Sequence, residues 1–126
     1  MSNVSRGARH ERAVADYLRL HGWSVERGFK RMAFVRGKML AIGFDLFGAF
    51  GLLAVKPGRN GPIRLIQVHA GTNVSVRRGK AFAAWEQGEV WENQGRGVYR
   101  VHRSESETEL VDTRIPHSAE KETGGT

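Results

Sequence analysis

The sequence predicts an α+β fold, a layered domain in which helices pack on a sheet, and three observations support this prediction. Two segments, residues 5–21 and 73–87, repeat apolar residues at the spacing of a helix. Short apolar or alternating segments between and after them have the character of strands. At 126 residues, 40% of them hydrophobic, the chain is long enough for one domain with one core.

The N-terminal part is predicted to form a helix and then a strand. From residue 5 to residue 21 apolar side chains recur every three or four positions, and Gly22 is a residue type that commonly ends helices. Residues 23–27 alternate in polarity, as a half-buried strand does. Residues 27–43 are basic and interrupted by glycines, so we interpret them as a long loop or a ragged hairpin.

The central part is predicted to contain two antiparallel strands. Residues 44–55 form a long apolar run, in which Gly48 and Gly51 indicate a bulge or a close approach of backbone. Residues 56–62 have the composition of a turn, and residues 63–69 form the second strand. Because the connection is short, we expect the two strands to be antiparallel.

The C-terminal part is predicted to contain a helix, two strands and a tail. Asn73 or Ser75 is suited to cap a helix that runs to about residue 87. Strands follow at residues 88–92 and 98–102, which gives the order α-β-β-β-α-β-β. From residue 103 the sequence is rich in Ser, Glu and Thr. We therefore expect a domain of residues 1–102 and an acidic, disordered tail of residues 103–126.

The charge of the chain is unevenly distributed. The net charge is +7, but residues 1–102 contain 17 Lys and Arg against 7 Asp and Glu, whereas residues 103–126 contain 3 against 6. A basic body predicts a polyanionic partner, most simply DNA, and the alternative is a basic surface that only aids solubility.

The composition also bounds where the protein acts. There is no run of about 18 apolar residues, so no membrane span and no membrane partner are predicted. The first ten residues are polar and basic, unlike a secretion signal. Cysteine is absent, which excludes disulfides and thiolate metal sites. We expect an intracellular, cytoplasmic protein.

Three polar residues interrupt the two central strands. Asp45 stands at the head of the first strand, and Gln67 and His69 stand near the end of the second. Burying such groups without partners costs roughly 1–3 kcal/mol each. Because Gln67 and His69 share one strand face, and the Asp45 end of the neighbouring strand lies close by, we expect a functional site here. The alternatives are a turn or capping role for Asp45 and a hydrogen-bonded pair for the other two.

The order of the elements and these residues resemble the PD-(D/E)XK nuclease superfamily, and within it the small archaeal and phage Holliday junction resolvase-like proteins. The resemblance includes the Gly-Phe-Asp45 strand start and the polar pair that ends the next strand. It also includes an opening helix with Gly7-Ala-Arg9-His-Glu11-Arg12, followed by Gly22-Trp23 and a strand. It covers residues 5–102. It implies a restriction-endonuclease-like αβββαβ core, in which a central mixed sheet is flanked by helices.

The resemblance also implies a metal-dependent DNA endonuclease, encoded by a phage or a cell, and a site for Mg²⁺ or Mn²⁺. Asp45 matches the metal-binding aspartate, Gln67 the second acidic ligand and His69 the catalytic lysine. Val68 would offer its backbone carbonyl, and Glu11 matches the supporting glutamate of the first helix. A metal in such a site polarises the phosphate and activates a water.

Two positions depart from the family pattern. Gln67 is neutral where the family has a carboxylate, and His69 replaces a lysine and is mostly neutral near pH 7 when unperturbed. Lys80, on the following helix, is expected to supply the missing cation, and Arg77 and Arg78 are further candidates. Glu11 has the alternative of a solvated partner for Arg9 or Arg12.

Basic and polar residues near the second helix are expected to contact phosphates. This set comprises Thr72, Asn73, Ser75, Arg77, Arg78 and Lys80, with Arg9 from the first helix. Arg36 and Lys38 are expected to grip a second DNA strand. The alternative for all of them is a solvated basic face.

Three functions follow from these observations. The first is a metal-dependent endonuclease that acts on duplex or branched DNA such as Holliday junctions, as a homodimer whose interface uses strand 44–55 and Trp91. The second is a nuclease-fold module that binds DNA without cleaving it. The third is a protein-interaction module on the same scaffold.

Overall fold

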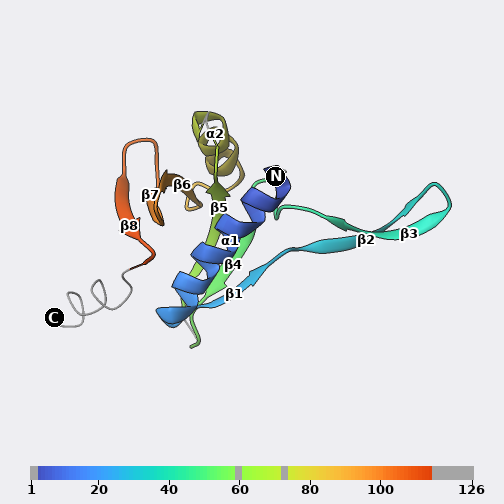
Figure 1. The fold of residues 1–126 in the computed structure, drawn as a ribbon, viewed down its shortest axis with the longest axis horizontal. Helices are drawn as coiled ribbons and strands as arrows, with labels where there is room; N and C mark the ends of the chain where they lie inside the picture. Colours follow the sequence, from blue (N-terminus) through green and yellow to red (C-terminus); the bar gives the residue numbers. More distant parts are fainter. Residues whose placement is uncertain (1–2, 59–60, 72–73, 115–126) are drawn as a thin grey trace.

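The computed structural model describes residues 3–58, 61–71 and 74–114, with side chains from residue 7 onward (Figure 1). These residues form two helices and eight strands in an α+β arrangement, as predicted. The elements are α1 (Asn3–Leu20), β1 (Ser24–Arg27), β2 (Lys30–Val35), β3 (Lys38–Gly43), β4 (Leu52–Val55), β5 (Ile63–His69), α2 (Val74–Ala84), β6 (Glu89–Gly95), β7 (Val98–His102) and β8 (Thr108–Asp112). Of the helices in these ranges, neither combines the length and the apolar character needed to cross a bilayer.

Six strands form one mixed sheet in the order β1-β4-β5-β6-β7-β8. Neighbouring strands are antiparallel except β5 and β6, which are parallel and are connected through α2. This is the expected consequence of connection length, since a parallel pair needs a long crossover, usually a helix. The predicted antiparallel pairing of the two central strands is confirmed, with Leu52 opposite Ile66 and Val55 opposite Ile63.

The two helices cover opposite faces of this sheet. Val14, Ala15 and Leu18 of α1 pack into one buried cluster that includes Ile66 of β5. Ala81 of α2 packs into a second cluster that includes Leu65, the residue beside Ile66. Because successive side chains of a strand point to opposite faces, the clusters lie on the two sides of the sheet. Each fully buried aliphatic side chain contributes about 1.5–3 kcal/mol, so both helices are held mainly by this packing.

The predicted strand over residues 44–55 is wrong in its first part, because only Leu52–Val55 form β4. The preceding residues fold into a tight turn, in which the Gly48 amide donates to the Asp45 carbonyl (2.9 Å) and the Phe50 amide to the Leu46 carbonyl (3.0 Å). Phe47 and Gly48 have φ angles of 55° and 70°, in the left-handed region that ends an extended strand. Asp45 therefore lies in a turn before β4.

The segment predicted as a loop or ragged hairpin is a regular two-stranded hairpin, which we call the arm (residues 30–43). Its six residue pairs run from Lys30 opposite Gly43 to Val35 opposite Lys38. Arg36 and Gly37 form its two-residue turn, with φ angles of 51° and 79° that match the type preferred in tight hairpins. The arm forms a separate sheet and projects away from the body of the protein (Figure 1).

The sheet continues past residue 102, where the disordered tail was expected to begin. Thr108–Asp112 form β8, which pairs with β7 along its whole length, and Val111 packs against the first cluster. The Ser104 hydroxyl accepts hydrogen bonds from the amides of Ser106 and Glu107 and so shapes the connecting turn. Residues 115–126 of the predicted tail lie outside the described part of the chain.

Candidate functional site

A groove of about 700 Å³ lies where α1, the base of the arm, the turn before β4 and the end of β5 meet. It brings together four of the residues predicted to form the site: Glu11, Asp45, Gln67 and Val68. These residues come from a helix, a turn and a strand that are far apart in sequence. Their convergence follows from the packing of α1 on β5 and from the pairing of β4 with β5.

Gly51 makes room for the Glu11 carboxylate beside Asp45. Its amide donates to the Ile66 carbonyl (3.0 Å), which fixes its position beside β5. A Cβ atom at this position would overlap Oε2 of Glu11 and would lie 3.6 Å from Oδ1 of Asp45. A larger residue would therefore displace the Glu11 carboxylate. The Glu11 carboxylate therefore occupies the space that the glycine leaves, and Asp45 lies beside it.

The electrostatics of the groove disfavour the ionised form of Glu11. Burial raises the pKa of the Glu11 carboxyl, the Arg27 guanidinium lowers it, and the Asp45 carboxylate raises it further, with an upward net shift. The raised pKa means that the negative charge of ionised Glu11 is not fully offset by positive charge in its partly buried position. A divalent cation would supply the missing charge.

The donor set of the groove fits a hard cation that keeps part of its water shell. Within the described ranges, no three or more His, Cys, Asp or Glu side chains cluster as a metal site would require. The groove therefore offers two carboxylates, with Val68 also in its lining, rather than a complete set of metal ligands. Mg²⁺ is commonly held by one or two carboxylates together with substrate phosphates and water, and Glu11 and Asp45 meet that need.

Gln67 is buried and hydrogen-bonds to the Arg77 side chain. When its amide nitrogen faces the Ala49 carbonyl, Nε2 donates to that oxygen (2.8 Å) and Oε1 accepts from Nη1 of Arg77 (2.9 Å). Gln67 is thus hydrogen-bonded through both ends of its amide, and its oxygen is engaged by Arg77 rather than directed to the carboxylates. Arg77 itself lines the groove.

The two residues predicted to supply the catalytic cation do not line the groove. His69 is buried at the end of β5, with 8% of its surface exposed, and Lys80 is exposed on α2. Of the three basic residues considered on α2, Arg77 lines the groove. Arg78 is partly buried and forms an ion pair with Glu105 (3.7 Å).

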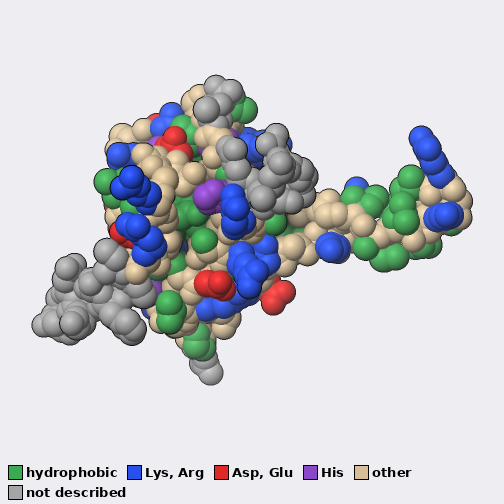
Figure 2. All heavy atoms as spheres, viewed as in Figure 1, with side chains coloured by type: hydrophobic (Ala, Val, Ile, Leu, Met, Phe, Trp, Pro, Cys, Tyr) green, Lys and Arg blue, Asp and Glu red, His purple; other side chains and the backbone are tan. Residues whose placement is uncertain are grey.

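The remaining predicted DNA contacts are spread over the surface. Ser75, Arg77 and Lys80 are exposed on α2, and Arg9 is exposed on α1. Arg36 and Lys38 are exposed at the tip of the arm, and Figure 2 shows basic side chains there, well away from the body. Thr72 and Asn73 lie outside the described residues.

The sequence did not point to Arg27 and Ala49, which interact with residues of the groove, or to Lys30, which lines it. Arg27 follows the alternating pattern of β1, and its guanidinium donates to the Ala8 carbonyl (3.0 Å), which ties β1 to α1. Ala49 supplies the carbonyl that orients Gln67, and Lys30 lines the groove at the base of the arm. In the sequence, Gly51 was the one sign of this packing, because a glycine within an apolar run indicates that another part of the protein approaches the backbone closely.

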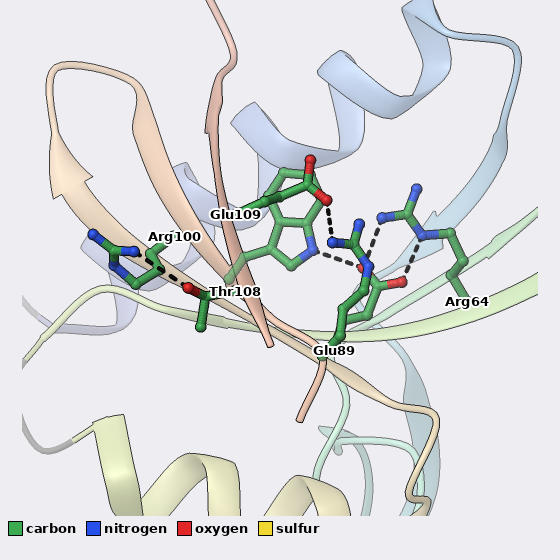
Figure 3. Close-up of polar contacts among 7 residues, drawn as sticks. Arg64, Glu89, Arg100, Thr108 and Glu109 are labelled. Atoms are coloured by element: carbon green, nitrogen blue, oxygen red, sulfur yellow. Dashed lines mark hydrogen bonds and ion pairs between the residues drawn. The ribbon is translucent and has the colours of Figure 1, made fainter. Parts of the chain in front are cut away.

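A second polar cluster lies around a pocket that, among the residues that the structure describes, shares no lining residue with the groove. Arg64 donates two hydrogen bonds to Glu89 (2.8 and 2.7 Å), and the Trp91 indole donates to the same carboxylate (2.9 Å) (Figure 3). The Arg64 guanidinium also lies over the Trp23 ring, 4.9 Å from its centroid. The cluster ties β5 to β6 and is structural.

Trp91 is 1% exposed, so its predicted place in a dimer interface is wrong.

Comparison of the chain with protein-family models, with curated proteins and with solved structures finds no match.

Proposed function

We propose that this protein is a metal-dependent DNA endonuclease of the PD-(D/E)XK type. The observation that carries the proposal is the convergence of Glu11, Asp45, Gln67 and Val68 in one groove. The topology supports it as well. With the arm set aside, the order α1-β1-β4-β5-α2-β6 is the αβββαβ order of the restriction-endonuclease-like core.

Glu11 and Asp45 would hold Mg²⁺ or Mn²⁺, assisted by the Val68 carbonyl. When bound, such an ion polarises the scissile phosphate and lowers the pKa of an attacking water. Gly51 keeps the two carboxylates close, and burial of Glu11 makes its ionised form depend on a nearby positive charge. These residues therefore bind and orient, and the chemistry depends on the cation they hold.

Arg77 takes the role that the family gives to a lysine. Its guanidinium lines the groove and is aligned by Gln67, so it would contact a phosphate oxygen and stabilise the charge that develops during hydrolysis. Arginine suits this task because it is always charged and presents a planar set of donors. A neutral glutamine suits its neighbour, because it orients Arg77 without cancelling its charge.

A second function, DNA binding without cleavage, is favoured by one observation. The Gln67 oxygen accepts from Arg77, so the groove presents two carboxylates where the family pattern has three acidic positions. A site with fewer ligands binds metal more weakly. On this hypothesis the protein retains the fold and the basic surface and lacks hydrolysis.

Cleavage assays separate these functions. Branched, single-stranded and linear duplex DNA are each incubated with the protein in Mg²⁺, in Mn²⁺ and in chelator. We expect cleavage only with a divalent cation, and its loss in Asp45→Asn and Glu11→Gln. Asp16→Asn is the matched control, because Asp16 is an exposed carboxylate of α1 that pairs with Arg19 (3.2 Å). DNA binding without cleavage under all conditions would refute the endonuclease and support the second function.

A further inference from the structure

The arm exposes a continuous apolar face. Phe34 lies opposite Met39 and Met32 lies opposite Ala41, so these four side chains share one side of the hairpin. Phe34 is 71% exposed, Met32 60% and Met39 58%. An isolated two-stranded hairpin is marginally stable in water, and contiguous exposed apolar side chains indicate a surface that binds something.

The charge of the arm identifies its partner as a polyanion. Residues 30–43 contain four basic residues and no acidic residue: Lys30, Arg31, Arg36 and Lys38. Two copies of such an arm would repel each other, which disfavours pairing between arms. Phosphate groups on either side of a nucleic-acid groove complement the charge.

The position of the arm connects it to the groove of Glu11 and Asp45. Lys30 and Gly43, the first and last residues of the arm, both line that groove. Just below them the Phe44 amide donates to the Phe29 carbonyl (3.0 Å), and the two rings lie 6.1 Å apart, which closes the base of the hairpin. DNA bound in the groove would therefore meet the arm directly.

The size and chemistry of the arm suit insertion into a duplex. A strand of six residues spans about 20 Å, close to the width of a duplex, and DNA grooves admit a two-stranded ribbon. Proteins that deform DNA combine basic side chains on phosphates with apolar wedges, among them Phe and Met, between base steps. Both kinds of side chain stand on this arm (Figure 2).

We propose that the arm inserts into a groove of the bound DNA, and that Phe34 and Met39 wedge apart a base step while Arg36 and Lys38 hold phosphates. This inference rests on the proposed function in that it takes DNA as the substrate. It adds the substrate class: DNA that unstacks at low cost, at a branch point, nick or mismatch.

The test uses the full chain in chelator, so that binding is measured without cleavage. DNA carries 2-aminopurine at successive positions, whose fluorescence rises where a base loses its stacking. We expect a rise at one step, lost in Phe34→Ser/Met39→Ser, with affinity lowered roughly tenfold. Arg36→Ala/Lys38→Ala is expected to weaken binding and reduce its salt dependence. The control Leu20→Ser/Leu110→Ser removes two side chains of the body that are each 58% exposed.

Each outcome decides between the hypotheses. Unchanged fluorescence and affinity in the Phe34/Met39 variant, with thermal melting as in the wild type, would overturn the inference. The inference would also be overturned if the wild type were a dimer and the variant a monomer that still binds DNA, because the apolar face would then bind a second copy of the chain. If the wild type and the Phe34/Met39 variant cleave DNA equally well, this inference is refuted and the proposed endonuclease is not. If the arm unstacks a base but the wild type does not cleave DNA in Mg²⁺, the proposed endonuclease is refuted and this inference is not. Absence of DNA binding at low salt refutes both.

Discussion

The carboxylates of Glu11 and Asp45 approach the same backbone position, Gly51, although one comes from the first helix and the other from the turn before β4. Two acidic groups placed this way repel each other, and burial raises the pKa of the Glu11 carboxyl. A fold that only needed stability would gain by neutralising one of them. The proposed metal site would account for this arrangement, because a bound cation would offset the repulsion.

Substitution of Gly51 tests this geometry. In Gly51→Ala the new methyl group would displace the Glu11 carboxylate, because the methyl carbon and Oε2 would overlap. We expect cleavage to fall about 100-fold, because the reacting groups are misplaced. The free energy of unfolding should change little, because the displaced atom is the end of a flexible side chain. Gly79→Ala is the control, since Gly79 lies in α2 with open space around its Cα and alanine favours helices. Full cleavage by Gly51→Ala would contradict the assignment.

The pH dependence of stability tests the environment of Glu11. Its pKa is raised above 4.5 in the folded state, so the folded protein binds a proton more tightly than the unfolded chain. Without metal, stability is therefore lost as the pH rises from about 4.5 through the folded pKa. Glu11→Gln removes this loss, so its stability relative to the wild type should rise as the pH increases above about 4.5 through the folded pKa of Glu11. Urea unfolding in chelator measures it, with exposed Glu26→Gln as the control, and parallel curves would refute the prediction.

The role of Arg77 is separable from that of the carboxylates. Arg77→Ala removes the guanidinium that Gln67 aligns, so we expect cleavage to fall about 100- to 1,000-fold. Stabilisation of the protein by Mn²⁺, measured by thermal melting, should persist, because the carboxylates remain. Arg100→Ala, on β7 and hydrogen-bonded to Thr108 (3.3 Å), is the control. Loss of the metal effect in Arg77→Ala would assign Arg77 to the structure of the site instead.

The second polar cluster is predicted to matter for stability. Glu89 is 7% exposed and accepts from both Arg64 and Trp91, so Glu89→Ala leaves a guanidinium and an indole without their partner (Figure 3). We expect the free energy of unfolding to fall by about 3 kcal/mol. Chemical unfolding measures this, and Asp112→Ala, which removes an exposed pair with Arg114 (3.0 Å), should change it far less. Equal effects would show that the buried cluster is not a stabilising unit.

Local pattern was enough to predict the elements whose burial is one-sided and regular. The helix ending near residue 20 and the strand over residues 63–69 are confirmed because their spacing of apolar residues reflects the face they bury. The run over residues 44–55 misled because an apolar segment can be a turn when glycines supply left-handed angles, as Gly48 does. The strand β8 is largely polar. It forms because its backbone pairs with the edge of β7 and because Val111 packs against the first cluster, and neither contact can be read from the local sequence pattern.

Both predicted carboxylates line the groove, and of the basic residues considered for its cation Arg77 lines it, whereas the first choice, Lys80, does not. Glu11 is positioned by the first helix and Asp45 by its place just before β4, and the sequence pattern predicts both of these elements. Which basic side chain reaches the groove depends on how α2 sits on the sheet. That packing brings Arg77 to Gln67 and leaves Lys80 in solvent. The apolar face of the arm was not predicted, because the basic residues and glycines of residues 27–43 indicated a loop or ragged hairpin, and the sequence does not show that Phe34 and Met39 are exposed.

Single-turnover cleavage of branched and duplex DNA is the most direct test of the central claim, that Glu11 and Asp45 form the metal site of an endonuclease. With protein in excess over DNA, we predict phosphodiester cleavage in Mg²⁺ or Mn²⁺, none in chelator, and loss of at least about 100-fold in Asp45→Asn while Asp16→Asn cleaves like the wild type. Cleavage that survives chelator, or that is the same in Asp45→Asn and the wild type, would contradict the claim.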